Sequence, residues 1–99
     1  MWTVVVLEDV IEDIERARDF YEGIAVGVGT YCAESLWGDL ERLAVYHGIH
    51  SVHFGFHRML ASRFPFGIYY RDTAVRTEVY AILDLRRDPS WIRRELGAR

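Results

Sequence analysis

The spacing of apolar residues divides the chain into a first half with helical periodicity and a second half with strand periodicity. Residues 2–7 are apolar and β-rich and predict a strand. From Glu8 onward apolar side chains recur every three or four positions, which predicts a helix that stops at Gly23. A second helix follows a short Gly-containing connection and ends near Gly48. Its inward residues are predicted to be Cys32, Leu36, Leu40, Leu43 and Val45, and its solvent-facing residues Glu34, Asp39, Glu41 and Arg42.

The second half predicts three strands, at 57–63, 66–71 and 75–84, with a tight turn at Asp72-Thr73. Asp88 and Pro89 then have the residue types of an N-cap and a first helical position, which predicts a short C-terminal helix. The resulting β-α-α-β-β-β order predicts an α+β fold. We expect one domain, residues 1–99, in which two helices pack on one face of a largely antiparallel sheet.

Charge is distributed unevenly over the 99 residues, whose formal net charge is −3. Residues 1–50 carry ten acidic residues and three arginines, whereas residues 51–99 carry five acidic residues and nine arginines. The basic half could meet nucleic acid or an acidic protein partner. No apolar run is long enough to span a membrane, no secretory signal is apparent and a single cysteine is present, so we expect a cytoplasmic protein.

All four histidines lie between His47 and His57. Their spacing is compatible with zinc ligands, but no Cys or carboxylate set completes a site, so we expect no metal and no cofactor. We expect a strand from Val52 with His53 and His57 on one face, preceded by a loop. A general acid–base role for His57 stays open, because imidazole titrates near neutral pH.

Two further features have structural explanations. Gly27 and Gly29 resemble a phosphate-binding loop, but no strand precedes them and no third glycine follows at the required offset. A turn between two helices is therefore expected. Cys32 lies on the apolar face of the second helix and predicts a buried thiol.

The segment RRDPSWIRREL, residues 86–96, is the densest basic feature of the chain. It can be interpreted as a solvated helix, or as a binding surface in which Trp91 and the flanking arginines meet a partner. Trp91 either docks the helix on the sheet or contacts that partner.

The order of motifs resembles the ParE branch of the RelE/ParE toxin superfamily. The resemblance rests on Arg63-Phe64-Pro65-Phe66, on Ile68-Tyr69-Tyr70, and on Arg86-Arg87-Asp88-Pro89 followed by Trp91. In the first half, EDIERARDFYE and VGVGTYCAESL are similar to the first helix of the family and to the start of its second. The resemblance extends over nearly the whole chain.

The resemblance implies the toxin of a type II toxin–antitoxin pair, which binds and inhibits DNA gyrase and is neutralised by a cognate antitoxin, in a hetero-oligomer. The contact residues it suggests are Arg63, Tyr69, Tyr70, Arg86, Arg87 and Trp91. Of the two tyrosines, one is expected to face the core and the other the open sheet face. Two alternatives stay open. One is a ribosome-dependent mRNA endonuclease using His57, Arg63 and Arg86, and the other is a relative that has lost toxicity.

Overall fold

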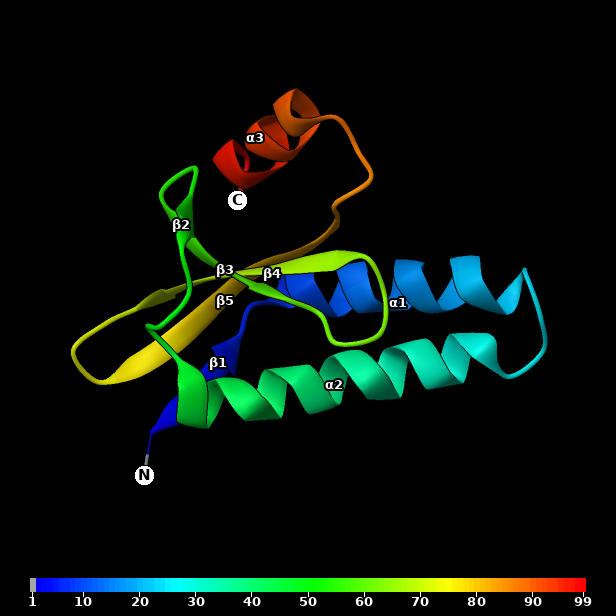
Figure 1. The fold of residues 1–99 in the computed structure, drawn as a ribbon, viewed down its shortest axis with the longest axis horizontal. Coiled ribbons are helices and arrows are strands. Elements are labelled where there is room, and N and C mark those ends of the chain that lie inside the picture. The colour runs from blue at the N-terminus through cyan, green and yellow to red at the C-terminus, as the bar shows by residue number, and fades with distance from the viewer. Residues whose placement is uncertain (1) are drawn as a thin grey trace.

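The computed structural model describes residues 2–99, and these form five strands and three helices (Figure 1). The elements in chain order are β1 (Thr3–Val6), α1 (Glu8–Glu22), α2 (Val28–Tyr46), β2 (Val52–His53), β3 (Phe56–Leu60), β4 (Phe66–Asp72), β5 (Arg76–Asp84) and α3 (Pro89–Gly97).

The strands make one sheet in the order β1-β5-β4-β3-β2. β1 pairs with β5 in parallel and all other neighbours are antiparallel. The α1–α2 hairpin covers one face of the sheet, and α3 lies against the other face (Figure 1). The predicted α+β fold, with two helices on one face of a largely antiparallel sheet and a short C-terminal helix, is confirmed.

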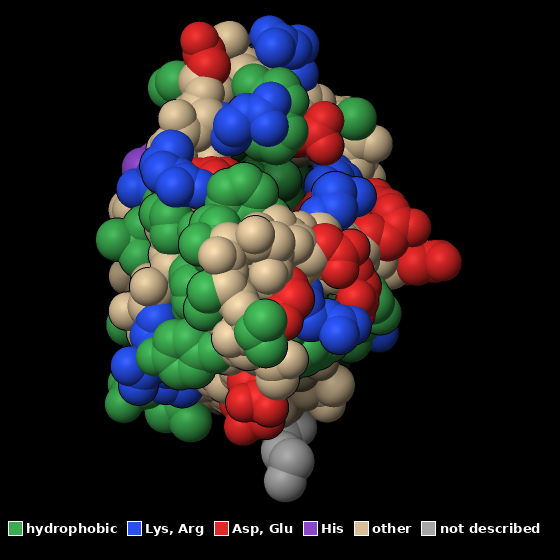
Figure 2. Space-filling model, turned by 90° about the vertical axis from the view of Figure 1, so that its right-hand side faces the viewer, with side chains coloured by type: hydrophobic (Ala, Val, Ile, Leu, Met, Phe, Trp, Pro, Cys, Tyr) green, Lys and Arg blue, Asp and Glu red, His purple; other side chains and the backbone are tan. Residues whose placement is uncertain are grey.

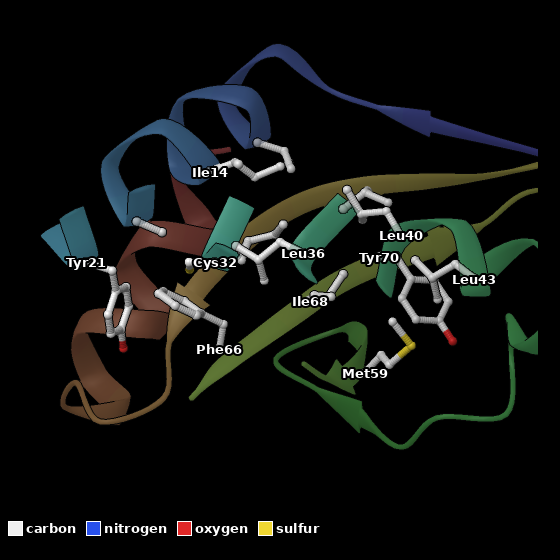
Figure 3. Close-up of a cluster of buried hydrophobic side chains, with 14 residues drawn as sticks. Ile14, Tyr21, Cys32, Leu36, Leu40, Leu43, Met59, Phe66, Ile68 and Tyr70 are labelled. Atoms are coloured by element: carbon white, nitrogen blue, oxygen red, sulfur yellow. The ribbon is translucent and has the colours of Figure 1, made fainter. Parts of the chain in front are cut away.

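The main hydrophobic core lies between the α1–α2 hairpin and the sheet (Figure 3). Leu36 and Leu43 of α2 are fully buried there, as their helical spacing predicts. Cys32 is also fully buried, and this burial raises the pKa of its thiol to about 11. The thiol therefore stays protonated near neutral pH and serves as a small apolar side chain.

The connection between α1 and α2 depends on Gly29, the second residue of α2. A Cβ atom at this position would collide with the carbonyl oxygen of Arg18 and lie 2.7 Å from the Cβ atom of Glu22. The Glu22 carboxylate accepts hydrogen bonds from the backbone N–H groups of Gly27 and Gly29, at 3.0 and 2.9 Å. These bonds lower the pKa of Glu22. The N-terminus of α2 thus already has a carboxylate, as expected of a helix–helix turn and not of a phosphate loop.

The strand predicted at 57–63 is wrong in its bounds. β3 ends at Leu60, and a further short strand, β2, precedes it. Phe54 and Gly55 turn the chain between the two strands with φ values of 55° and 85°. Two successive positive φ values are typical of a two-residue hairpin turn, and they interrupt the single strand expected from Val52 to His57.

Two predictions about α2 are also wrong. Val45, expected to face inward, is 74% exposed because it lies two residues after the buried Leu43 and therefore on the opposite side of the helix. Asp39, expected to be solvated, is fully buried. Its carboxylate accepts a hydrogen bond from the backbone N–H of Ser62 at 3.0 Å and lies 2.6 Å from the guanidinium of Arg42. Asp39 thereby fixes the loop between β3 and β4 to α2.

Candidate functional site

A groove of about 800 Å³ lies between α1 and α3, and we call it the α1–α3 groove. Arg86, Arg87 and Trp91, three residues predicted to contact a partner, line it together. The other lining residues are Asp13, Arg16, Ala17, Phe20, Phe66, Ile82, Leu83, Asp84 and Glu95. Figure 2 shows the face of the molecule that lies on the right in Figure 1. Hydrophobic side chains lie in its middle, basic side chains lie above them toward α3, and acidic side chains lie along one side.

The two arginines that precede α3 are held differently. The guanidinium of Arg86 donates to the carboxylate of Asp84 at 2.7 Å, and this hydrogen bond lowers the pKa of Asp84. The charge of Arg86 is therefore compensated. Arg87 instead places its guanidinium 3.8 Å from the ring centroid of Trp91. Cation–π stacking holds this guanidinium, and Arg87 is exposed and forms no ion pair within the described residues, so its N–H groups can take an acceptor.

Trp91 is half-buried and packs beside the cluster that α3 makes with the sheet. Ile92 and Leu96, also on α3, are the buried members of this cluster. The predicted N-cap is confirmed, because Asp88 accepts a hydrogen bond from the backbone N–H of Ser90 at 2.8 Å. Trp91 thus docks α3 on the sheet and also lines the groove, and its contact with a partner stays a prediction.

A buried ion pair that the sequence did not predict fixes the C-terminal end of α3. Arg99 donates to both carboxylate oxygens of Asp13, at 2.8 and 2.9 Å. Only 7% of the Arg99 side chain and 2% of the Asp13 side chain are exposed. Asp13 also accepts from the backbone N–H of Ile82 at 3.0 Å, so one carboxylate joins α1, β5 and the segment after α3. No local pattern marks a contact between residues this far apart in sequence.

Arg63 does not line the α1–α3 groove. It lies in the exposed loop between β3 and β4, with its guanidinium 5.8 Å from the ring centroid of Tyr31. The loop is at the same end of the sheet as Arg86, because Phe66 of β4 pairs with Asp84 of β5. Arg63 is thus a separate exposed cation near the groove.

Tyr69 and Tyr70 point to opposite faces of the sheet, as expected. Tyr70 belongs to the core under α1 and α2, and Tyr69 to the cluster under α3. The second face is not open at this position, however, since both tyrosines are fully buried. A bulge in β5 occurs beside them, because Tyr69 pairs with Ala81 and Tyr70 with Val79. Their side chains support the surfaces above them and are not themselves accessible.

The histidine-rich segment is built into the sheet by hydrogen bonds. The Tyr70 hydroxyl lies 2.5 Å from Nδ1 of His50 and accepts from the backbone N–H of Gly48 at 2.9 Å. Burial and the nearby His57 lower the pKa of His50. His57 stacks on the Tyr70 ring, and its Nδ1 lies 2.6 Å from the His50 carbonyl oxygen. These contacts attach the connection after α2 to β4.

His47 belongs to a second network at the same end of the sheet. Its Nδ1 lies 2.8 Å from the carboxylate of Asp72, and its ring stacks on Trp2. Burial of Asp72 is outweighed by hydrogen bonds from Thr77 and His47, so the pKa of Asp72 is lowered. Within residues 2–99 no group of His, Cys, Asp or Glu side chains has a metal-binding arrangement.

The residues of the nuclease alternative are not brought together. His57 pairs with Tyr70 across β3 and β4, whereas Arg86 follows Asp84, which pairs with Phe66 at the other end of β4. Phe66 and Tyr70 are four residues apart along β4, which corresponds to about 13 Å. His57 also faces the α1–α2 side of the sheet through its stacking on Tyr70. A shared phosphate contact for His57, Arg63 and Arg86 is absent from this arrangement.

A mixed five-stranded sheet, with a helical hairpin on one face and a short helix on the other, places this chain in a known class of α+β proteins. The structure is similar to a chain of the solved structure described as "Chromosomal ParDE TA system from P. aeruginosa", with a TM-score of 0.73. The match covers 83% of this chain and 94% of that chain, with 16% sequence identity. The chain therefore has a ParE-like fold, as its motifs suggested.

No protein-family model and no curated protein sequence matches this chain. No helix within residues 2–99 combines the length and apolar character needed to cross a membrane.

Proposed function

We propose that this protein is the toxin of a type II toxin–antitoxin pair, bound and neutralised in the cytoplasm by a cognate antitoxin in a hetero-oligomer. The observation that carries the proposal is the ParE-like fold, shared over 83% of the chain with a member of a solved ParDE system. The predicted motifs Arg63-Phe64-Pro65-Phe66 and Arg86-Arg87-Asp88-Pro89 add support, since they occur in the order expected of this branch.

The α1–α3 groove is the proposed antitoxin-binding surface. It combines the exposed ring of Phe20, the half-buried ring of Trp91 and the guanidinium of the exposed Arg87. An amphipathic helix could place apolar side chains against the two rings and a carboxylate on Arg87. Such a segment could be disordered alone and fold on binding. Arg63, exposed at the same end of the sheet, extends this surface, whereas the buried Tyr69 and Tyr70 do not line the groove.

We propose DNA gyrase as the target, inhibited by binding. Inhibition of this kind needs no catalytic set, which agrees with the separation of His57 from Arg63 and Arg86. The test is to induce the chain alone in a bacterial host and to follow thymidine and methionine incorporation over the first minutes. We expect DNA synthesis to stop first and the cells to filament. An immediate arrest of protein synthesis would instead indicate the ribosome, and no arrest would indicate a relative without toxicity.

Two variants connect the groove to the proposed partner. The antitoxin candidate is the product of the small gene beside that of the toxin, and its binding is measured by calorimetry. Arg87→Ala and Trp91→Ala are each expected to weaken binding at least tenfold, because truncation of a stacked Arg or Trp at an interface typically has this effect. Arg94→Ala is the matched control, since Arg94 is exposed on α3 but lines no part of the groove. Equal binding by the wild-type protein and the three variants would contradict the proposed surface.

A further inference from the structure

A second pocket, of about 400 Å³, lies between the β2–β3 hairpin and α3, and we call it the hairpin pocket. Its lining residues are Phe54, Phe56, Arg71, Tyr80, Arg93, Leu96, Gly97 and Arg99. It shares no lining residue with the α1–α3 groove, so the two open on different sides of α3. Nothing in the proposed toxin function uses this pocket.

The hairpin pocket is the more cationic of the two. Three arginines and no acidic residue line it, whereas three arginines and three acidic residues line the α1–α3 groove. The charge of Arg99 is taken by Asp13. Arg71 and Arg93 form no ion pair with any other residue of the described range 2–99. Two uncompensated positive charges therefore face this pocket.

Arg71 is fixed in place although it has no acidic partner. Its guanidinium lies 3.9 Å from the ring centroid of Phe56 and 5.5 Å from that of Tyr80, and its Nε donates to the Gly55 carbonyl oxygen at 3.1 Å. Stacking orients a guanidinium without using its terminal N–H groups. Arg71 can therefore accept a bidentate carboxylate with little further loss of side-chain freedom.

Phe54 gives an independent indication of a binding role. It is the first residue of the hairpin turn and has a φ of 55°, a region where a bulky aromatic residue is strained. Asn, Asp or Gly is the usual choice at this position. The turn thus does not explain the phenylalanine. Its ring is 42% exposed and lies 5.6 Å from the Arg93 guanidinium, so it provides an apolar surface at the mouth of the pocket.

We propose that the hairpin pocket binds an acidic protein segment, with a carboxylate bound by Arg71 and Arg93 and a neighbouring apolar side chain packed on Phe54. Arginine clusters recognise acidic motifs in this way. Nucleic acid fits less well, because a strand requires a row of cations along its phosphates, and the chain as a whole carries a charge of −3. The ligand chemistry is independent of the toxin function proposed above.

The test is an NMR titration of the full chain labelled with ¹⁵N. The probe is an acetylated and amidated hexapeptide of alternating glutamate and leucine, and its matched control has glutamine in place of each glutamate. We expect the acidic peptide to shift the Nε–H signals of Arg71 and Arg93 and the amide signals of Gly55 and Gly97. The glutamine peptide is expected to bind at least tenfold more weakly. A third titration uses a twelve-nucleotide oligothymidine.

Three variants separate binding from folding. Arg93→Gln is expected to weaken binding of the acidic peptide at least fivefold, whereas Arg94→Gln on the same helix should leave the affinity within twofold of the wild-type value. Phe54→Asn introduces the residue that the turn prefers, so it should raise the urea midpoint and at the same time weaken binding at least fivefold. A stability gain combined with a binding loss is not expected of a phenylalanine that is only structural.

Several outcomes would overturn the proposal. These are the absence of shifts at Arg71 and Arg93, equal affinity for the acidic and glutamine peptides, or Arg93→Gln binding like Arg94→Gln. Tighter binding of oligothymidine than of the acidic peptide would indicate a nucleic-acid site instead. Toxicity of the chain plays no part in these titrations, so they can fail while the proposed toxin function stands, and the reverse also holds.

Discussion

Substitution of Arg99 tests how the C-terminal helix is held. In Arg99→Ala the Asp13 carboxylate keeps the backbone N–H of Ile82 at 3.0 Å and the Arg16 guanidinium at 2.5 Å, but loses its bidentate partner. The Arg16 side chain is 65% exposed, so its charge is screened by water and replaces only part of the loss. The backbone carbonyl of Tyr80, which accepts from Arg99 at 3.2 Å, also loses a donor.

The expected cost follows from burial of both partners. Removing one member of a buried ion pair destabilises proteins by about 3–5 kcal/mol, because the remaining charge stays buried without compensation. Since Arg16 and Ile82 still contact Asp13, we expect about 3 kcal/mol for Arg99→Ala. Arg99→Lys keeps the charge but not the planar pair of donors, and should lose about half as much. Arg94→Ala, on the exposed side of α3, should change stability by less than about 0.5 kcal/mol.

Urea unfolding, followed by tryptophan fluorescence, gives these free energies. Hydrogen exchange at the amides of Ile92 and Leu96 tells whether α3 detaches before the rest of the domain unfolds. A double-mutant cycle with Asp13→Asn and Arg99→Met should give a coupling energy above about 1.5 kcal/mol. A cost for Arg99→Ala equal to that of Arg94→Ala, or a coupling near zero, would refute the view that this pair holds α3 in place.

Three other predictions concern single positions. Gly29→Ala should destabilise the protein by more than about 2 kcal/mol, because the added Cβ would collide with α1. Gly38→Ala in the same helix should instead stabilise the protein by about 0.5–1 kcal/mol, because a Cβ there meets nothing within 4 Å. The urea midpoints of the two variants test this difference. Tyr70→Phe should cost about 1–2 kcal/mol, measured in the same way, because the Gly48 N–H and His50 lose their shared partner. The pKa of His50 is lowered in the folded protein, so as the pH falls below the unfolded value near 6.5 the unfolded state binds the proton first and the protein loses stability. His50→Gln should reduce this loss of stability between about pH 7.5 and 5.5. Thermal midpoints that fall equally in the wild-type protein and the variant would contradict the prediction.

The three helices and their place among the strands along the chain could be predicted because they depend on local patterns. Apolar residues every three or four positions mark α1 and α2, and Asp88-Pro89 marks the start of α3. The β2–β3 hairpin was missed because Phe54-Gly55 is not a usual turn pair, so the alternation from Val52 to His57 looked like one continuous strand.

The candidate sites were harder to predict because they depend on contacts between distant residues. Arg86, Arg87 and Trp91 were found since they are adjacent in sequence. Arg71 and Arg93 were not, because Arg71 of β4 and Arg93 of α3 come together only after the sheet and α3 have assembled. Acidic residues occur throughout the first two turns of α1, and most are solvated, so nothing local distinguishes the buried Asp13 from its exposed neighbours.

The charge asymmetry along the sequence becomes an asymmetry between layers of the fold. All ten acidic residues of the first half lie on α1 and α2, which cover one face of the sheet. The nine arginines of the second half lie on β3, β4 and β5, in the loop between β3 and β4, and on or beside α3. Asp13 and Asp39 differ from the other acids, because each is buried and fixes a distant segment. Asp13 of α1 pairs with Arg99, but within the described residues 2–99 no carboxylate of α1 or α2 forms an ion pair with Arg71, Arg87 or Arg93. An acidic partner is therefore attracted to the arginines on and beside α3, where the hairpin pocket lies and where Arg86 and Arg87 line the α3 side of the α1–α3 groove.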